Sequence, residues 1–100
     1  MEDIRHLYSC LLEANEDAFD GQLFKVAYHA LSGAMYCALQ LQDALKMDEV
    51  ERRARDQWQA VKNHFPRAYP SSGPTEVGLY ASLVEIANVR SDLLRRGALF

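Results

Sequence analysis

The sequence has 100 residues, of which 49% are hydrophobic and 25% are charged, and its formal net charge at pH 7 is −3. This length fits one domain spanning residues 1–100. The chain has enough apolar side chains for a core that needs no disulfide or metal to stabilise it. Acidic and basic residues are interspersed, so no clustered basic face indicates a nucleic-acid partner. No apolar stretch approaches the ~20 residues of a membrane span. We therefore expect neither nucleic-acid binding nor a membrane protein.

The cysteines and the acidic start of the chain indicate a cytoplasmic location. Met1-Glu2-Asp3 lacks the basic and apolar regions of a signal peptide. Cys10 and Cys37 both fall inside helical patterns. We expect two free thiols in a reducing compartment rather than a disulfide.

Apolar periodicity predicts a first helix over 2–17 and a second over 22–45, separated by the Asp20-Gly21 pair. The second helix has the strongest periodicity in the chain, and small residues fill the middle of its apolar stripe, where a neighbouring helix can approach closely. This stripe consists of Leu23, Ala27, Ala30, Leu31, Ala34, Ala38, Leu41 and Leu45.

A third helix is predicted over 48–65, because Asp48 and Glu51 have the spacing of a capping box and Pro66 ends the pattern. Trp58 continues its narrow apolar stripe and is expected in the core. All three prolines fall in 65–74, which we expect to be a loop. Thr75 can cap a fourth helix over 75–96, with Gly97 as its stop. The sequence therefore predicts an all-α, up-and-down four-helix bundle.

The sequence favours neither a metal nor a cofactor. The Glu-x-x-His pairs of di-iron carboxylate bundles are missing. His6 and Cys10 lie one helical turn apart and could supply two ligands to zinc or copper. Two ligands do not make a closed site, and no second pair has matching spacing, so we expect none.

His29 is the candidate functional residue of the second predicted helix. It lies about 200° around the helix from Ala27 and should face solvent. Gly33 follows one turn later on the same side, Lys25 lies one turn earlier and Ser32 is adjacent. A mid-helix glycine costs roughly 1 kcal/mol relative to alanine, and close approach of another molecule is one reason to keep it.

The six residues that begin at His29 resemble the histidine, apolar and glycine-small pattern of histidine-containing phosphotransfer domains. These domains are four-helix bundles in which an exposed mid-helix histidine relays a phosphoryl group between aspartates of partner proteins. The resemblance implies that His29 is the phosphoacceptor, that Gly33 leaves room for a receiver domain and that Lys25 stabilises phosphate charge. Asp20 matches the acidic residue often found near the start of that helix. Ser32 replaces the usual lysine, which removes a cation from beside the phosphoryl group.

The fourth predicted helix has two apolar strips where a surface helix needs one. The expected core face consists of Val77, Tyr80, Leu83, Val84, Ala87 and Leu94. The second strip, roughly opposite, consists of Leu79, Ile86, Val89 and Leu93. Either this helix is buried on both sides, or the second strip meets a partner, most simply another copy of the chain.

These patterns lead to one principal functional prediction and one alternative. The principal prediction is a non-enzymatic, cytoplasmic protein–protein interaction module with a protein partner, which includes a homodimer through the second strip of the fourth helix. The alternative is a phosphotransfer protein that uses His29.

Overall fold

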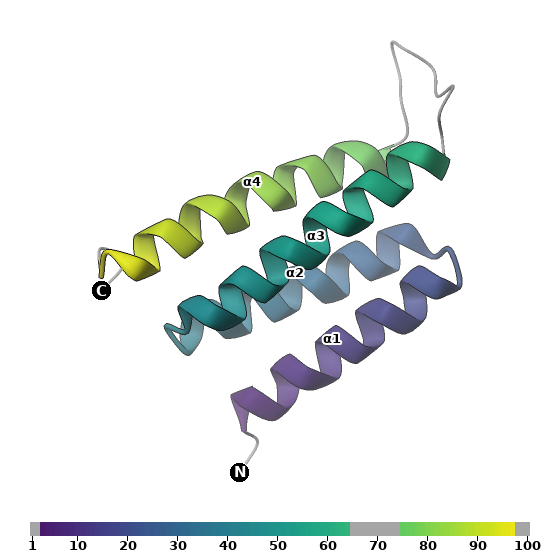
Figure 1. The fold of residues 1–100 in the computed structure, drawn as a ribbon. Coiled ribbons are helices and arrows are strands. Elements are labelled where there is room, and N and C mark those ends of the chain that lie inside the picture. Colours follow the sequence, from purple (N-terminus) through teal and green to yellow (C-terminus); the bar gives the residue numbers. More distant parts are fainter. Residues whose placement is uncertain (1–2, 65–74, 98–100) are drawn as a thin grey trace.

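The computed structural model describes residues 3–64 and 75–97, which form four α-helices. They are α1 (Ile4–Asp20), α2 (Phe24–Gln40), α3 (Ala44–His64) and α4 (Thr75–Arg95). Successive helices run in opposite directions, so the start of α1 and the end of α4 lie at the same end of the bundle (Figure 1). The predicted all-α four-helix bundle is confirmed. Within the described ranges, no helix is both long and apolar enough to cross a membrane.

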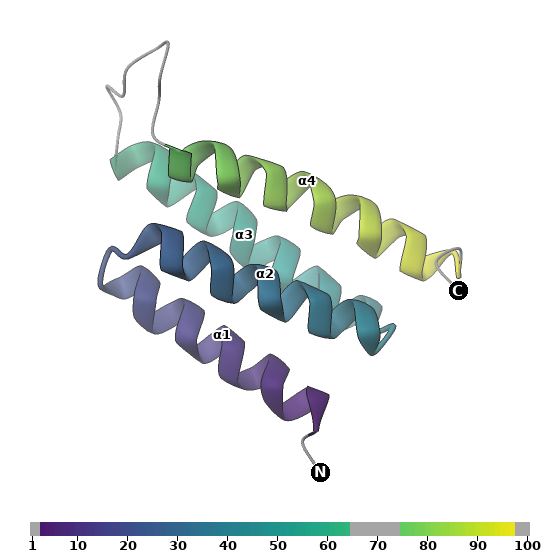
Figure 2. The ribbon, with the colours of Figure 1, turned by 180° about the vertical axis from the view of Figure 1, so that it is seen from behind.

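The bundle is flattened, with α1 and α4 at opposite edges. The α1 helix packs along α2 and α3 packs along α4, while α2 contacts both α3 and α4. The Cα atoms extend over 42 × 29 × 16 Å. Both the front and the back views place α1 and α4 on the outside of the group (Figures 1 and 2). Each edge helix therefore has a face that no neighbouring helix of the described chain covers.

The turn between α2 and α3 lies earlier than the sequence predicted. The α2 helix ends at Gln40 and α3 begins at Ala44, so the predicted helix over 22–45 is wrong at its end. The predicted capping box is wrong too, because Asp48 lies inside α3. The residue that caps α3 is Asp43, whose Oδ1 accepts a hydrogen bond from the backbone nitrogen of Lys46 at 3.1 Å. The apolar spacing continues across this turn, so the sequence pattern gives no sign that one helix ends and the next begins there.

The centre of the predicted α2 stripe is confirmed, and its ends are not. Ala27, Leu31 and Ala34 are completely buried. Leu23 is 58% exposed and Leu45 is 79% exposed, because Leu23 precedes the first turn of α2 and Leu45 belongs to the first turn of α3. The buried core combines side chains from all four helices: Tyr8, Phe24, Leu31, Ala34, Met35, Cys37, Ala38, Met47, Val50, Ala54, Val61, Tyr80, Leu83, Val84 and Ala87.

The predictions for the third and fourth helices hold in most positions. The expected α4 core residues are buried or packed against the core, and Gly97, with φ +68°, follows the end of α4 as predicted. Trp58 is only partly buried. It packs against the core, and the Lys62 Nζ lies 3.9 Å from its ring centroid. The predicted stop at Pro66 and the predicted loop over 65–74 lie outside the described residues.

The α1–α2 and α2–α3 turns share one backbone motif, the Schellman motif, in which a left-handed residue ends the helix. At the first turn, the Leu23 nitrogen donates to the Ala18 oxygen at 2.9 Å and the Gln22 nitrogen to the Phe19 oxygen at 2.9 Å. The same two bonds recur 20 positions later at Gln42 and the residue after it. Gln22 has φ 61° and Gln42 has φ 51°, a region that costs a residue with a Cβ about 1–2 kcal/mol.

We expect Gln22→Gly and Gln42→Gly each to raise the free energy of unfolding by about 0.5–1 kcal/mol. Glycine adopts a positive φ without the Cβ clash, and the gain is reduced by its greater freedom in the unfolded chain. Urea denaturation of each variant measures the change. A loss of stability at both positions would contradict the strain argument.

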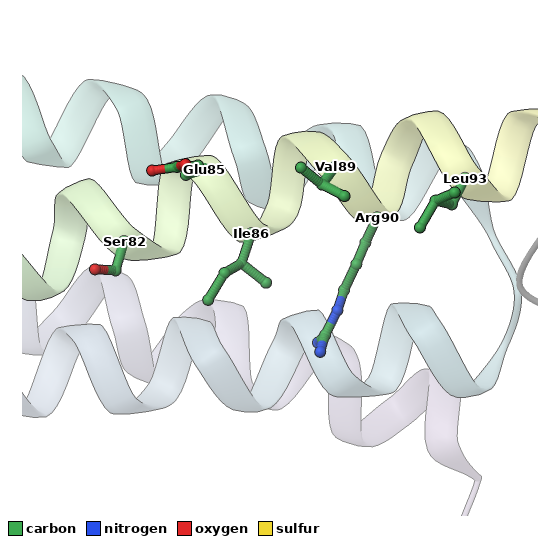
Figure 3. A pocket seen from close by; sticks show the side chains of 6 residues that line it. All are labelled: Ser82, Glu85, Ile86, Val89, Arg90 and Leu93. Carbon is green, nitrogen blue, oxygen red and sulfur yellow. The ribbon is translucent and has the colours of Figure 1, made fainter.

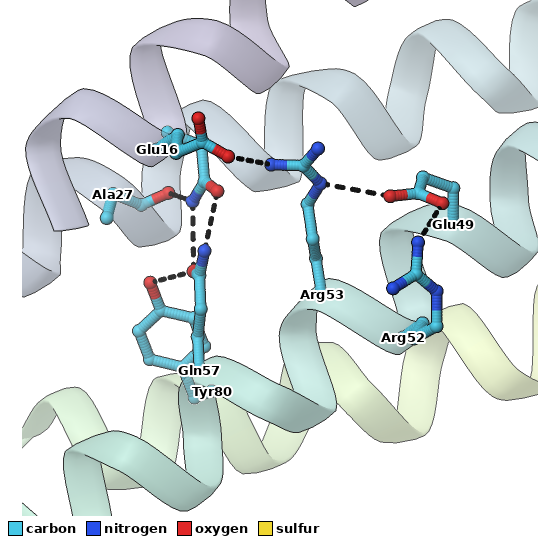
Figure 4. Close-up of polar contacts among 8 residues, drawn as sticks. Glu16, Ala27, Glu49, Arg52, Arg53, Gln57 and Tyr80 are labelled. Carbon is cyan, nitrogen blue, oxygen red and sulfur yellow. Dashed lines mark hydrogen bonds and ion pairs between the residues drawn. The ribbon is translucent and has the colours of Figure 1, made fainter. Parts of the chain in front are cut away.

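A buried cluster of polar side chains joins all four helices inside the bundle, nearer to the α1–α2 turn than to the α2–α3 turn (Figure 4). The Asn15 amide nitrogen donates to the backbone oxygen of Ala27 at 2.7 Å and to Oε1 of Gln57 at 3.0 Å. The Gln57 Nε2 donates to Oδ1 of Asn15 at 2.7 Å, and the Tyr80 hydroxyl donates to Oε1 of Gln57 at 2.7 Å. Burial raises the pKa of Tyr80 above its ordinary value, so its hydroxyl keeps the proton that it donates.

We expect Gln57→Leu to lower the free energy of unfolding by about 2–4 kcal/mol, because it leaves Asn15 and Tyr80 buried without their partner. A triple variant, Asn15→Leu with Gln57→Leu and Tyr80→Phe, leaves none of these side-chain polar groups unpaired. It should be more stable than Gln57→Leu alone. Urea denaturation compares the two. A single variant within about 0.5 kcal/mol of the native protein would behave like a surface substitution and would contradict this role.

A charged cluster on the surface links α1 to α3 beside this network (Figure 4). Arg53 lies 3.2 Å from a carboxylate oxygen of Glu49 and 3.5 Å from one of Glu16. Partial burial opposes ionisation of Glu49, but the hydrogen bonds from Arg52 and Arg53 outweigh it and lower the pKa of that carboxyl. The contact from Arg53 to Glu16 is the one that joins α1 to α3, and Glu16 is exposed. A pair with an exposed carboxylate typically contributes less than about 1 kcal/mol, so the buried network is the stronger constraint on how α1 docks.

Candidate functional site

The outer face of α4 presents apolar side chains to solvent. Ile86 is 42% exposed and Val89 is 52% exposed, while Leu79 and Leu93 are partly exposed. The predicted second strip therefore lies on the surface of the described chain and is not buried against another helix. We call these four residues, Leu79, Ile86, Val89 and Leu93, the outer strip. Its position follows from the place of α4 at one edge of the flattened bundle (Figure 2).

A shallow groove of about 390 Å³ follows the outer strip (Figure 3). The residues that line it are Ser82, Glu85, Ile86, Val89, Arg90 and Leu93. Ser82 has the smallest side chain among them. Figure 3 shows that Arg90 extends toward α2, whereas Glu85 lies on the other edge of α4. The apolar floor of the groove is thus bordered by one charge of each sign.

Arg90 is held against α2 by an aromatic ring. The centre of its guanidinium lies 5.3 Å from the ring centroid of Tyr36, which is 56% exposed. Its Nη1 atom is buried and has no hydrogen-bond partner among the described residues. Neither Glu85 nor Arg90 forms an ion pair within residues 3–64 and 75–97. Neither charge is therefore balanced by an ion pair within the described residues.

His29 is exposed on α2, as predicted, and so is Lys25 one turn earlier. The imidazole packs edge-on against its neighbour Tyr28, with ring centroids 5.0 Å apart. Ser32 is partly buried, and its Oγ has no hydrogen-bond partner in the described part of the chain. His29 thus has the solvent access that phosphoryl transfer would need.

Gly33 does not face open solvent, contrary to the prediction. A Cβ at this position would lie 3.2 Å from Cδ1 and 3.3 Å from Cδ2 of Leu11. The α1 helix therefore packs across Gly33, and helix packing explains the mid-helix glycine. The space that the resemblance assigns to a receiver domain beside Gly33 is filled by Leu11.

We expect Gly78→Ala to raise the free energy of unfolding by about 0.5–1 kcal/mol, and Gly33→Ala to raise it less or to lower it. Both changes add helix propensity, but a Cβ at Gly78 meets nothing within 4 Å in the described structure, whereas one at Gly33 crowds Leu11. With Leu11→Ala in the same chain, the effect of Gly33→Ala should approach that at Gly78. Urea denaturation of these variants measures the coupling, and equal gains in the native background would contradict the packing argument.

His6 and Cys10 do lie together on α1, with 3.5 Å between Nε2 and Sγ. No further histidine, cysteine or carboxylate joins them: the described residues hold no group of three or more such side chains that could bind a metal ion. The pair therefore lacks the additional protein ligands that a zinc site needs.

The sequence prediction located the outer strip but missed the polar residues around it. An apolar pattern along the fourth helix gives no sign of Ser82, Glu85 and Arg90, which are polar. Their spacing relative to Ile86 and Val89 was the available signal. The contact between Arg90 and Tyr36 joins two helices and could not be read from either one.

Comparison of the chain with models of known protein families, with curated proteins and with solved structures finds no match. Function must therefore be inferred from the chain's own residues and surfaces.

Proposed function

We propose that the protein is a non-enzymatic protein–protein interaction module that binds a protein partner through the outer strip of α4. The observation that carries this proposal is the exposure of Ile86 and Val89 in the middle of that strip. Burial of apolar surface contributes roughly 25 cal/mol per Å², so a partner that covers the strip gains binding energy. Contiguous apolar surface with a polar border is typical of such contact sites.

The phosphotransfer alternative has less support. It requires an exposed His29, and His29 is exposed. It also assigns the space beside Gly33 to a docking receiver domain, and the side chain of Leu11 occupies that space. No observation favours this alternative over the interaction module.

We also propose a cytoplasmic location for the module. Cys10, which is exposed, and Cys37, which is buried, are both unpaired. An exposed free thiol is better suited to a reducing compartment than to an oxidising one.

The experiment that tests the proposal places a photo-activatable side chain, benzoylphenylalanine, at Val89 in cells that produce the protein. We expect one discrete cross-linked protein, which is either another chain or a second copy. A matched control carries the same side chain at Val26, which is 56% exposed on α2 against 52% for Val89, and should give no adduct. Adding Ile86→Glu and Leu93→Lys should abolish the adduct at position 89 while leaving the helical circular dichroism unchanged.

Three outcomes would overturn the proposal. These are the absence of an adduct at Val89, equal adducts at Val89 and Val26, and an adduct that survives the two charged substitutions in the strip.

A further inference from the structure

We propose that the partner of the outer strip is a second copy of the same chain, whose α4 runs parallel to the first, so that Glu85 of each copy meets Arg90 of the other. This inference rests on the proposed function and specifies its partner and geometry. It is carried by the spacing of the apolar residues on α4 and by the two unpaired charges that border them.

The outer strip has the seven-residue spacing of a coiled-coil seam. Leu79, Ile86 and Leu93 recur at intervals of seven, which corresponds to the a positions of a heptad repeat. Ser82 and Val89 then occupy the d positions between them. An α-helix drifts only about 20° per heptad from this repeat, so the five side chains stay on one face over the length of α4. This face is the one that borders the groove (Figure 3).

The same register gives the two bordering charges complementary places. Glu85 precedes the a residue Ile86 and takes a g position, and Arg90 follows the d residue Val89 and takes an e position. The two lie about 140° apart around one helix, so they cannot pair with each other within α4. Two charged residues near the end of α4 do have partners, since Asp92 pairs with Arg96 at 3.0 Å and Arg95 pairs with Asp48.

Charge complementarity selects the parallel arrangement. In a parallel pair of helices the g side of one faces the e side of the other, which brings each Glu85 to the partner's Arg90. In an antiparallel pair, equivalent flanks meet, so the flank with Glu85 would face its own equivalent and the flank with Arg90 would face its own equivalent. The parallel pair therefore forms two equivalent ion pairs, and the antiparallel pair places like charges together.

The position of Arg90 and the shape of the bundle favour this contact. The ring of Tyr36 holds the guanidinium toward the α2 side of α4, so less side-chain freedom is lost when a carboxylate binds it. Because α4 lies at an edge of the bundle (Figures 1 and 2), a second α4 can lie alongside it. One pair of helices of this length gives an interface at the small end of the known range, so we expect a dissociation constant on the order of 1–100 µM.

The first experiment measures self-association of the whole chain by sedimentation equilibrium over a range of concentrations around that constant. We expect a monomer–dimer equilibrium that the Ile86→Glu and Leu93→Lys pair abolishes. Glu85→Arg alone and Arg90→Glu alone should each weaken the dimer about tenfold or more, because each puts like charges opposite one another twice. The matched control Glu13→Arg, at an exposed position on α1, should leave the dimer unchanged.

Recombining the two charge variants tests their pairing. An equimolar mixture of Glu85→Arg and Arg90→Glu chains should form heterodimers more tightly than either forms homodimers, because each acidic side then meets a basic one. A single chain with both substitutions should regain the native dissociation constant to within a few-fold. Failure of both would overturn the assigned contact.

The last experiment determines the orientation with engineered cysteines in a Cys10→Ser background. In a parallel dimer, Ser82→Cys faces its own equivalent and should form a disulfide-linked dimer on mild oxidation. In an antiparallel dimer with Ile86 opposite Val89, Ser82→Cys would instead cross-link to a Leu93→Cys chain. That second pattern would overturn the parallel arrangement.

A native chain that stays monomeric well above 100 µM, the weak end of the expected range, would overturn the second copy as partner. A position-specific adduct of Val89 with a different protein would still support the interaction module.

Discussion

The paired amides of Asn15 and Gln57 are the constraint on which the packing of the bundle depends. The hydrophobic effect is non-directional, whereas a buried amide must find its partner within hydrogen-bond distance. These two amides bond to each other, to the backbone of α2 and to Tyr80 on α4. Because the side chains of Asn15, Gln57 and Tyr80 come from α1, α3 and α4, a shift of any of these three helices by one turn would leave a buried polar group unpaired.

The two faces of α4 differ in whether their polar groups have partners within the bundle. On the inner face, Tyr80 completes the network and Ser91 bonds to Asp48 of α3, so the polar groups there have partners within the bundle. On the outer face, Glu85 and Arg90 border exposed apolar side chains and have no ion pair in the described structure. The inner face accounts for how α4 docks. The outer face has two charges without an ion pair beside exposed apolar side chains, and association with another protein chain would use both.

The sequence predicted helix number, class and most of the core, because apolar spacing reports directly on which helix faces are buried. It failed where structure depends on contacts between helices. The turn after Gln40 was missed because a glutamine, and not a glycine, adopts the left-handed conformation there. Gly33 was assigned to solvent because a helical wheel of α2 alone could not show that Leu11 of α1 lies across it.

For the candidate site too, features within one helix could be predicted from the sequence and contacts between helices could not. The outer strip was predicted from periodicity within one helix, and its exposure at Ile86 and Val89 agrees with that prediction. The contact of Arg90 with Tyr36 joins two helices and needed the fold. Buried polar residues escaped notice for a related reason, since a pattern of apolar positions gives no sign that Asn15 is completely enclosed.

The two thiols of this chain differ in burial, and we expect them to differ in chemical reactivity for that reason. Cys37 lies in the core, and burial raises the pKa of its thiol, so the reactive thiolate is scarce and shielded. Cys10 is exposed on α1. An alkylating reagent that modifies Cys10 at once would reach Cys37 only when α2 separates from its neighbours. The rate at which Cys37 is modified therefore reports on opening of the core of the native chain. Modification of Cys10 in the same sample serves as an internal standard for the reagent, so no label has to be introduced.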